Sequence, residues 1–129
     1  MQNHIKTLGW LQIAIHGINI LIGLAFLFGS SLFGMAAGLA AVPVLGLLFG
    51  ALGWLIAGLF IVIGLPGTII GWYIIQRKPW ARIAGIVLCV IDLFFAHTLG
   101  ISQIAGIYGL WVLFNSETIR IFDTEVRGY

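Results

Sequence analysis

Apolar residues run along this chain in long stretches that polar residues interrupt only rarely. Four stretches could cross a membrane, at about residues 8–28, 44–75, 80–97 and 102–122, and the last becomes polar toward its end. A helix needs about 20 mainly apolar residues to cross a hydrocarbon core of about 30 Å. Regular alternation of polar and apolar positions is missing, so membrane strands are not expected. The pattern predicts one transmembrane domain over residues 1–129, an all-α integral membrane four-helix bundle with an outer loop at residues 29–43.

Composition favours a surface that faces lipid. Of the 129 residues, 61% are hydrophobic and only 8% are charged, whereas soluble domains carry about 25% charged residues. This composition excludes three classes of protein: ordinary soluble enzymes, disordered proteins and polyanion-binding domains. Its single cysteine, Cys89, excludes an intramolecular disulfide and leaves too few thiolates for a cysteine-built zinc site.

The basic residues predict the orientation in the membrane. The chain has six of them: Lys6, Arg77, Lys78, Arg82, Arg120 and Arg127. They lie before the first span, between the second and third, and after the fourth, and we expect all but the last of them at the membrane interface. With four crossings these regions share one side, so the positive-inside rule places both termini in the cytoplasm. The chain is therefore expected to be a multi-pass protein of the cell inner (cytoplasmic) membrane. Three tryptophans are expected near the same boundary: Trp10, Trp72 and Trp80.

Small residues recur at helical spacing and predict close helix packing. The predicted packing residues are Gly46, Gly50, Gly53, Ala57, Gly64, Gly67 and Gly71 in the second span, Gly85 in the third, and Gly106 and Gly109 in the fourth. In lipid, small faces let helix backbones approach closely, and dispersion accumulates along the contact. Pro66 interrupts the second span and predicts a helix kink there, because proline lacks the N–H that the preceding turn requires.

Four polar side chains are predicted to form a cluster near the bilayer centre. His16 and Asp92 each lie ten residues beyond a basic anchor, about 15 Å above the cytoplasmic boundary, and Tyr108 falls in the same layer. Asn19 shares a helix face with His16. An ionised Asp there costs at least about 2.5 kcal/mol, so we expect Asp92 to meet His16, with Asn19 or Tyr108 completing the hydrogen bonds. This cluster could be a polar clasp that sets helix register, a proton relay, or a contact to a ligand.

Motifs for catalysis are missing from the sequence. It contains no phosphate-binding glycine loop, no nucleophile elbow and no zinc-protease helix motif. We therefore predict that the chain is not an enzyme and holds no metal, with His16 as the candidate ligand should a haem or pigment bind. No cofactor is predicted; bound lipid is expected, and chlorophyll, haem or quinone are left open.

Two motifs mark the C-terminal half. They read Lys78-Pro79-Trp80-Ala81-Arg82 and Gly106-x-Tyr108-Gly109-Leu110-Trp111-Val112-Leu113, followed by Glu117 and Phe122. In these residues the chain resembles a group of small, mostly uncharacterised bacterial four-span membrane proteins, over about residues 64–123. It lacks the proline usual before the last span in that group and reads Leu99-Gly100 there, so this turn is expected to differ. The resemblance implies a four-helix architecture and no activity.

The leading functional prediction is a non-catalytic small subunit or scaffold that packs against other membrane proteins in a larger complex. Four short spans cannot use every glycine face among themselves, so some small faces should meet other chains. The expected partners are membrane lipid and other membrane protein subunits or further copies of this chain, and not nucleic acid. Two alternatives are a homo-oligomeric channel or proton-linked carrier that uses the layer around Asp92, and a pigment-, quinone- or lipid-binding subunit.

Overall fold

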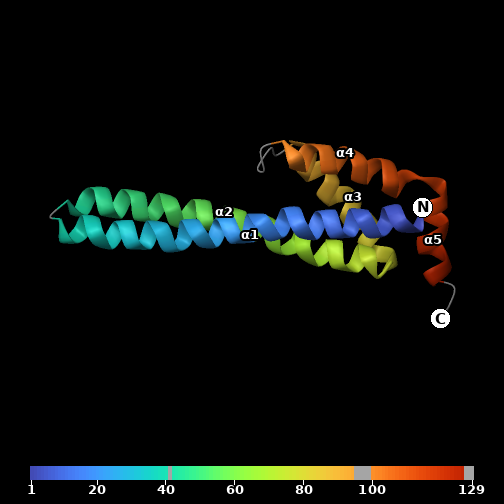
Figure 1. Cartoon of the computed structure of the whole chain (residues 1–129), viewed down its shortest axis with the longest axis horizontal. Coiled ribbons are helices and arrows are strands. Elements are labelled where there is room, and N and C mark those ends of the chain that lie inside the picture. Colours follow the sequence, from blue (N-terminus) through green and yellow to red (C-terminus); the bar gives the residue numbers. More distant parts are fainter. Residues whose placement is uncertain (41, 95–99, 127–129) are drawn as a thin grey trace. The chain divides into compact units, whose positions relative to one another are not determined.

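The computed structural model describes residues 1–40, 42–94 and 100–126, and within them every regular segment is α-helical. Figure 1 shows the helices in chain order: α1 (Gln2–Leu39), α2 (Pro43–Ile75), α3 (Pro79–Phe94), α4 (Ile101–Phe114) and α5 (Ser116–Val126). The predicted all-α class is confirmed. Pro66, where the sequence predicts a kink, lies inside α2. Its nitrogen carries no hydrogen, so the helix lacks one backbone hydrogen-bond donor there.

The predicted outer loop over residues 29–43 is wrong for most of its length, because α1 continues to Leu39. This stretch contains no proline before Pro43 and no charged residue, so nothing local ends the helix. Its small residues instead pack on α2: a Cβ added to Gly34 would lie 3.2 Å from the carbonyl oxygen of Gly46. α2 then begins at Pro43, a residue suited to the first position of a helix.

The predicted fourth span over residues 102–122 divides into two helices at Asn115. This residue ends α4 in an extended conformation, with φ −66° and ψ 134°. Its side-chain Oδ1 accepts a hydrogen bond of 3.0 Å from the backbone N–H of Glu117 and so caps the start of α5. The apolar part of this span is therefore the 14-residue α4, about 21 Å long, and α5 is a separate helix.

The chain forms two compact units, and the single transmembrane domain over residues 1–129 stays a prediction. The bundle unit comprises Met1–His16 and Pro66–Tyr129, and the hairpin unit comprises Gly17–Leu65. Helix α1 passes from the first unit into the second, and α2 returns to the first at Pro66. The division follows the contacts: three additional helices pack in the bundle unit, whereas the hairpin unit consists of segments of α1 and α2 alone.

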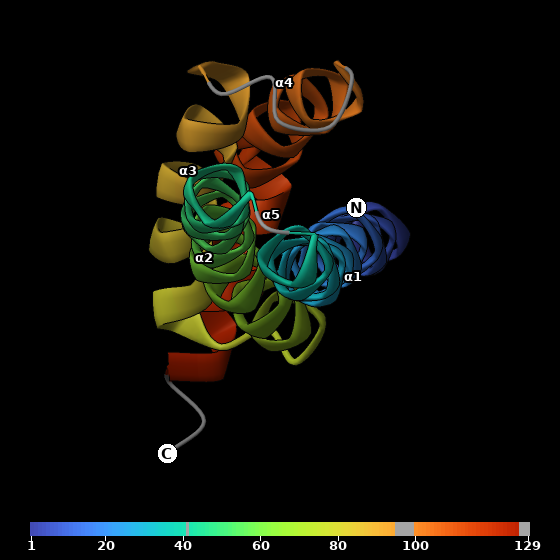
Figure 2. The same cartoon turned by 90° about the vertical axis from the view of Figure 1, so that its left-hand side faces the viewer.

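The bundle unit has a hydrophobic core drawn from all five helices. Its fully or almost fully buried members are Ile5, Leu8, Ile74, Ala81, Cys89, Val112, Leu113 and Phe122. Helices α3 and α4 pack side by side (Figure 2) with their backbones close together. A Cβ added to Gly106 would lie 2.7 Å from the carbonyl oxygen of Cys89. The guanidinium of Arg82 crosses the same interface and donates to the carbonyl oxygen of Leu113 at 3.1 Å.

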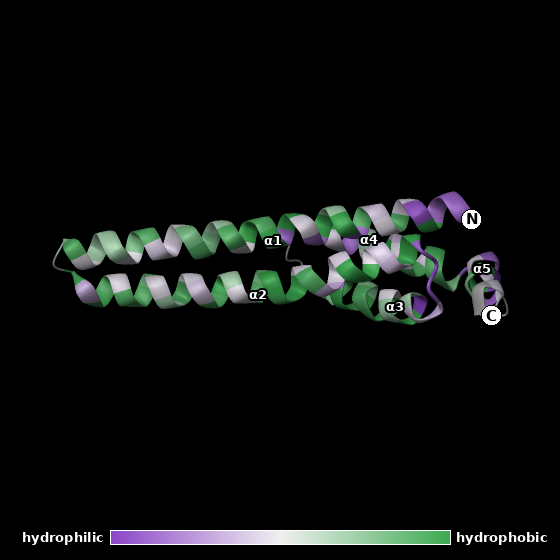
Figure 3. Cartoon of the chain, turned by 90° about the horizontal axis from the view of Figure 1, so that it is seen from below, coloured by the Kyte–Doolittle hydropathy of each residue, from purple (hydrophilic) through white to green (hydrophobic). Residues whose placement is uncertain are grey.

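The hairpin unit contains no Asp, Glu, Lys, Arg or His. Figure 3 shows polar residues at the start of α1 and in α5, whereas most of α1 and α2 is apolar. The two segments of the hairpin unit meet through small residues. A Cβ added to Gly23 would lie 3.0 Å from the carbonyl oxygen of Ala57. Most large apolar side chains of this unit consequently remain exposed.

Among the described residues, α1 and α2 are the two helices long and apolar enough to cross a membrane. α1 has 38 residues and α2 has 33, so their contour lengths are about 57 Å and about 50 Å, beyond a hydrocarbon core of about 30 Å. α3 and α4 have 16 and 14 residues and run about 24 Å and about 21 Å. The four-span arrangement stays a prediction.

Candidate functional site

A buried histidine and a buried aspartate meet inside the bundle unit. Nε2 of His16 on α1 lies 3.4 Å from Oδ2 of Asp92 on α3, and both side chains are 0% exposed. If the imidazole is protonated, the two form an ion pair in a region of low dielectric, where either charge alone would be costly. The structure thus brings together two of the four residues of the predicted polar cluster.

Glycines on two other helices make room for this pair. A Cβ added to Gly67 on α2 would collide with ring atoms Cγ and Cδ2 of His16, so only glycine leaves space for the imidazole. On the opposite side, a Cβ added to Gly106 on α4 would stand 3.5 Å from the Cβ of Asp92. All four long helices of the bundle unit therefore contribute to the surroundings of His16 and Asp92.

A second polar contact links the same two helices one turn away. Gln12 lies four residues before His16 and is also 0% exposed. Its Nε2 donates to Sγ of Cys89 at 3.5 Å, and Cys89 lies three residues before Asp92. Because spacings of three and four put residues on one helix face, the two contacts form a short polar ladder between α1 and α3.

Tyr108, a third member of the predicted cluster, has a different partner. The hydroxyl of Tyr108 pairs with Nδ1 of His4 at 2.9 Å. His4 lies twelve residues before His16 on α1, so the two histidines are about 18 Å apart along the helix. The Trp111 ring also meets the His4 ring edge-on, with centroids 5.7 Å apart. The expectation that Tyr108 completes the Asp92 site is corrected accordingly. Asn19 is fully buried and belongs to the hairpin unit.

The predicted basic residues occupy different settings. In the bundle unit, Arg77 donates from Nη2 to Oε1 of Gln2 at 3.4 Å, which brings the α2–α3 turn next to the start of α1. Arg82 is held by the α4 carbonyl described above and is partly buried. The other three predicted interfacial cations are exposed: Lys6, Lys78 and Arg120.

At the described helical glycines of the bundle unit, neighbouring atoms fill the space that a side chain would need. At each of six helical glycines described there, an added Cβ would fall closer than 3.0 Å to another atom: Gly9, Gly67, Gly71, Gly85, Gly106 and Gly109. Five of these were predicted as packing residues, and Gly9 was not. At Gly71, the nearest atom is the carbonyl oxygen of Gly9 at 2.9 Å, so the backbones of α1 and α2 touch there.

The hairpin unit uses its glycines differently. Gly46 and Gly53 meet α1, and the predicted Ala57 and Gly64 are buried. At five other glycines an added Cβ would meet nothing within 4 Å: Gly17, Gly29, Gly38, Gly50 and Gly58. A Cβ added to Gly50, a predicted packing residue, would also meet nothing within 4 Å, although the Cα of Gly50 lies 3.9 Å from a Cβ built on Gly34 of α1. These five glycines are called the open glycines below.

Sequence reasoning missed the seam on α1 that faces α2. Its members recur every seven residues: Gly9, His16, Gly23, Ser30 and Ala37. In the bundle unit the first two face Gly71 and Gly67, and in the hairpin unit the last three face α2 residues including Gly53 and Gly46. The seven-residue period, in which four of the five side chains are small, is the signal that could have revealed this seam, since it keeps one helix face toward a partner helix.

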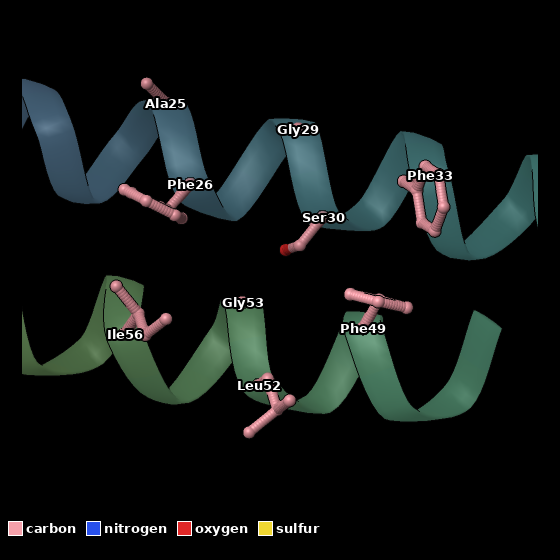
Figure 4. Close-up of a pocket in the computed structure, with 9 residues that line it drawn as sticks. All are labelled: Ala25, Phe26, Gly29, Ser30, Phe33, Phe49, Leu52, Gly53 and Ile56. Atoms are coloured by element: carbon pink, nitrogen blue, oxygen red, sulfur yellow. The ribbon is translucent and has the colours of Figure 1, made fainter. Parts of the chain in front are cut away.

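The hairpin unit also contains an apolar groove of about 660 Å³. Figure 4 shows the residues that line it: Ala25, Phe26, Gly29, Ser30, Phe33, Phe49, Leu52, Gly53 and Ile56. Phe33 and Phe49 meet edge to face at one end, with ring centroids 5.4 Å apart. Ser30 is the single polar side chain in the lining, and its hydroxyl already donates to the carbonyl oxygen of Leu27 at 3.3 Å. The lining of the groove is therefore almost entirely apolar.

No group of three or more His, Cys, Asp or Glu side chains that could hold a metal occurs in the described part of the chain. His16 contacts Asp92 and lies against Gly67, a tight setting in which the ring is enclosed by protein.

Comparison of the chain with protein-family models, with curated proteins and with solved structures finds no match.

Proposed function

We propose that this chain is a non-catalytic subunit or scaffold of a membrane protein complex, and that its hairpin unit is the surface that meets other membrane proteins. One observation carries the proposal: the bundle unit fills every described helical glycine, whereas the hairpin unit leaves five open. Glycine in a helix interior costs about 1 kcal/mol relative to alanine. Open glycines therefore weaken the isolated chain, and a second helix packed against them would use the close approach that they permit.

The proposal includes a four-span arrangement in the inner membrane with both termini in the cytoplasm. The distribution of Lys and Arg supports this orientation. The absence of ionisable residues from the hairpin unit supports its burial in lipid or in apolar protein. Since α1 is about 57 Å long, it must tilt, bend or be covered by protein where it exceeds the hydrocarbon core.

The test is a pull-down of the full tagged chain from its own membrane in mild detergent, followed by mass spectrometry and a visible spectrum. We expect other membrane proteins to co-purify. Gly29→Leu and Gly58→Leu should release them while helical content by circular dichroism stays unchanged, because a side chain at either position points into open space. Ala14→Leu is the matched control, since it places the same leucine side chain at an exposed small residue of α1 in the bundle unit.

Two results would contradict the proposal. The unmodified chain could purify as a colourless homo-oligomer without other proteins, or both glycine variants could keep all partners. A coloured preparation with an absorbance band would instead favour a pigment- or haem-binding subunit.

A proton-linked carrier or channel is the second candidate, and the buried pair of His16 and Asp92 favours it. Asp92→Asn preserves the shape of the side chain but removes its exchangeable charge. If the pair relays protons, dye-reported proton flux into liposomes should be present with the native chain and lost in the variant. If the pair is a clasp, both proteins should give the flux of empty liposomes.

A further inference from the structure

The bundle unit has an aromatic groove between α1 and α2 that the proposed function does not use. Its volume is about 450 Å³, and it is lined by Trp10 and Ile13 from α1 and by Thr68, Ile69, Trp72 and Tyr73 from α2. Trp10 and Trp72 are 58% and 51% exposed, so large ring surfaces stay open at its walls. Indole rings of this kind favour the boundary between hydrocarbon and headgroups.

Positive charge gathers at one end of this groove. Lys6 lies one helical turn before Trp10 and Gln2 one turn before Lys6, so the three side chains share a face of α1. Arg77 donates to the Gln2 side chain at 3.4 Å, which brings its guanidinium to the same end. Lys78 follows directly.

No carboxylate in the described part of the chain forms a salt bridge with these three cations. Glu117, an acid on α5, lies 3.5 Å from the N-terminal ammonium of Met1. The positive charge of Lys6, Arg77 and Lys78 is therefore available to an external anion.

We propose that this groove binds an anionic phospholipid, with an acyl chain against Trp10 and Trp72 and the phosphate at Lys6 and Arg77. The apolar walls match a hydrocarbon chain, and a guanidinium can give two parallel hydrogen bonds to phosphate oxygens. The basic end and the apolar walls follow one another along α1, in the order in which a lipid carries its headgroup and chain. The site rests on the membrane embedding proposed above, and it is separate from the hairpin surface.

The charge is tested by native mass spectrometry of the purified full chain with dioleoyl phosphatidylglycerol and dioleoyl phosphatidylcholine. Each basic residue near a lipid surface contributes about fivefold in affinity, so two residues predict about a 30-fold preference for phosphatidylglycerol. Lys6→Gln and Arg77→Gln should each reduce this preference about fivefold. Arg120→Gln, the same change on the exposed face of α5, should leave it unchanged.

The acyl chain is tested in the same assay. Joint Trp10→Ala and Trp72→Ala substitution should weaken both lipids, whereas Trp54→Ala, at a residue 59% exposed in the hairpin unit, should not. Soluble glycerol 3-phosphate, which has the phosphate without the chains, should fail to displace bound phosphatidylglycerol.

Equal affinity for the two lipids, an equal loss with Arg120→Gln, or displacement by glycerol 3-phosphate would each overturn the lipid site. Two further measurements separate the lipid site from the proposed function: whether the chain enters nanodiscs, and whether it keeps its partner proteins. A chain that enters nanodiscs and keeps its partners but shows no lipid preference refutes the lipid site alone. A chain that does not enter them refutes both proposals.

Discussion

The fit of His16 against Gly67 allows the packing of the buried pair to be tested by adding a single methyl group. In Gly67→Ala the new Cβ would fall on the imidazole ring, and the ring cannot move freely because Asp92 lies 3.4 Å from its Nε2. In Gly58→Ala the same methyl group meets nothing within 4 Å. The two variants therefore make the same chemical change in a filled and in an open position.

The expected magnitudes follow from two opposing effects. Alanine gains about 1 kcal/mol over glycine in a helix interior, and this gain is common to both variants. Overpacking costs about 1–3 kcal/mol and applies only at Gly67. Gly58→Ala should thus stabilise the chain by up to about 1 kcal/mol, and Gly67→Ala should be less stable than Gly58→Ala by about 1–3 kcal/mol. The deficit would grow if His16 is forced away from Asp92.

The assay is equilibrium unfolding in mild detergent with guanidinium, followed by circular dichroism and extrapolated to zero denaturant. A double-mutant cycle then identifies the cause of the cost. In a His16→Ala background the obstructing ring is gone, so Gly67→Ala should recover the gain of about 1 kcal/mol. Both substitutions of the cycle lie in the bundle unit and affect the same contact between Gly67 and His16.

Two results would refute this reasoning. Equal effects of Gly67→Ala and Gly58→Ala on the free energy of unfolding would show that the imidazole does not occupy the space beside Gly67. An unchanged cost of Gly67→Ala in the His16→Ala background would place the clash elsewhere.

Three further substitutions test other contacts in the bundle unit. Gln12→Leu should leave stability unchanged or raise it by about 1 kcal/mol in the same unfolding assay, because its Oε1 is buried without a hydrogen bond among the described residues and its contact with Cys89 is long. A loss of more than about 1 kcal/mol would show that the amide is needed. Gly106→Ala should be less stable than Gly58→Ala by about 1–3 kcal/mol, since the added Cβ meets the backbone of α3, which cannot rotate away. Equal stability of these two variants would contradict this close approach. Asn115→Ala should cost about 1 kcal/mol and speed hydrogen exchange in α5, because the cap on Glu117 is lost. Unchanged hydrogen exchange at the start of α5 would show that the Asn115 side chain does not stabilise this helix.

Much of the helical structure follows from local chemistry that the sequence states directly. Long runs without charge or proline predict helices over most of residues 8–28 and 44–75, and these lie within α1 and α2. Pro79 suits the first position of a helix, and α3 begins there, next to the predicted span start at about residue 80. Helix formation depends mainly on residues within one or two turns, so these patterns can be read without knowing the partner helices.

The sequence also predicted that His16 would meet Asp92. That inference used distance along each helix from a basic anchor, a quantity that stays valid when helices run across the same layer. The same measure failed for Tyr108, whose hydroxyl pairs with His4. Its depth was counted from Arg120, which lies in α5, so the count crossed the extended residue Asn115 that separates α5 from α4. Depth along a helix is valid only while the helix continues unbroken.

By itself, then, the sequence determined that this chain is helical, apolar and rich in small helix faces. Only the tertiary structure decided which faces are occupied: Gly67 lies against an imidazole, Gly106 lies against a carbonyl oxygen, and Gly58 faces open space. It also decided that α1 continues to Leu39, where packing on α2 replaced the expected loop. The physical reason is that a missing side chain permits close approach in each of these cases, but whether another atom fills the space depends on residues far away in the chain.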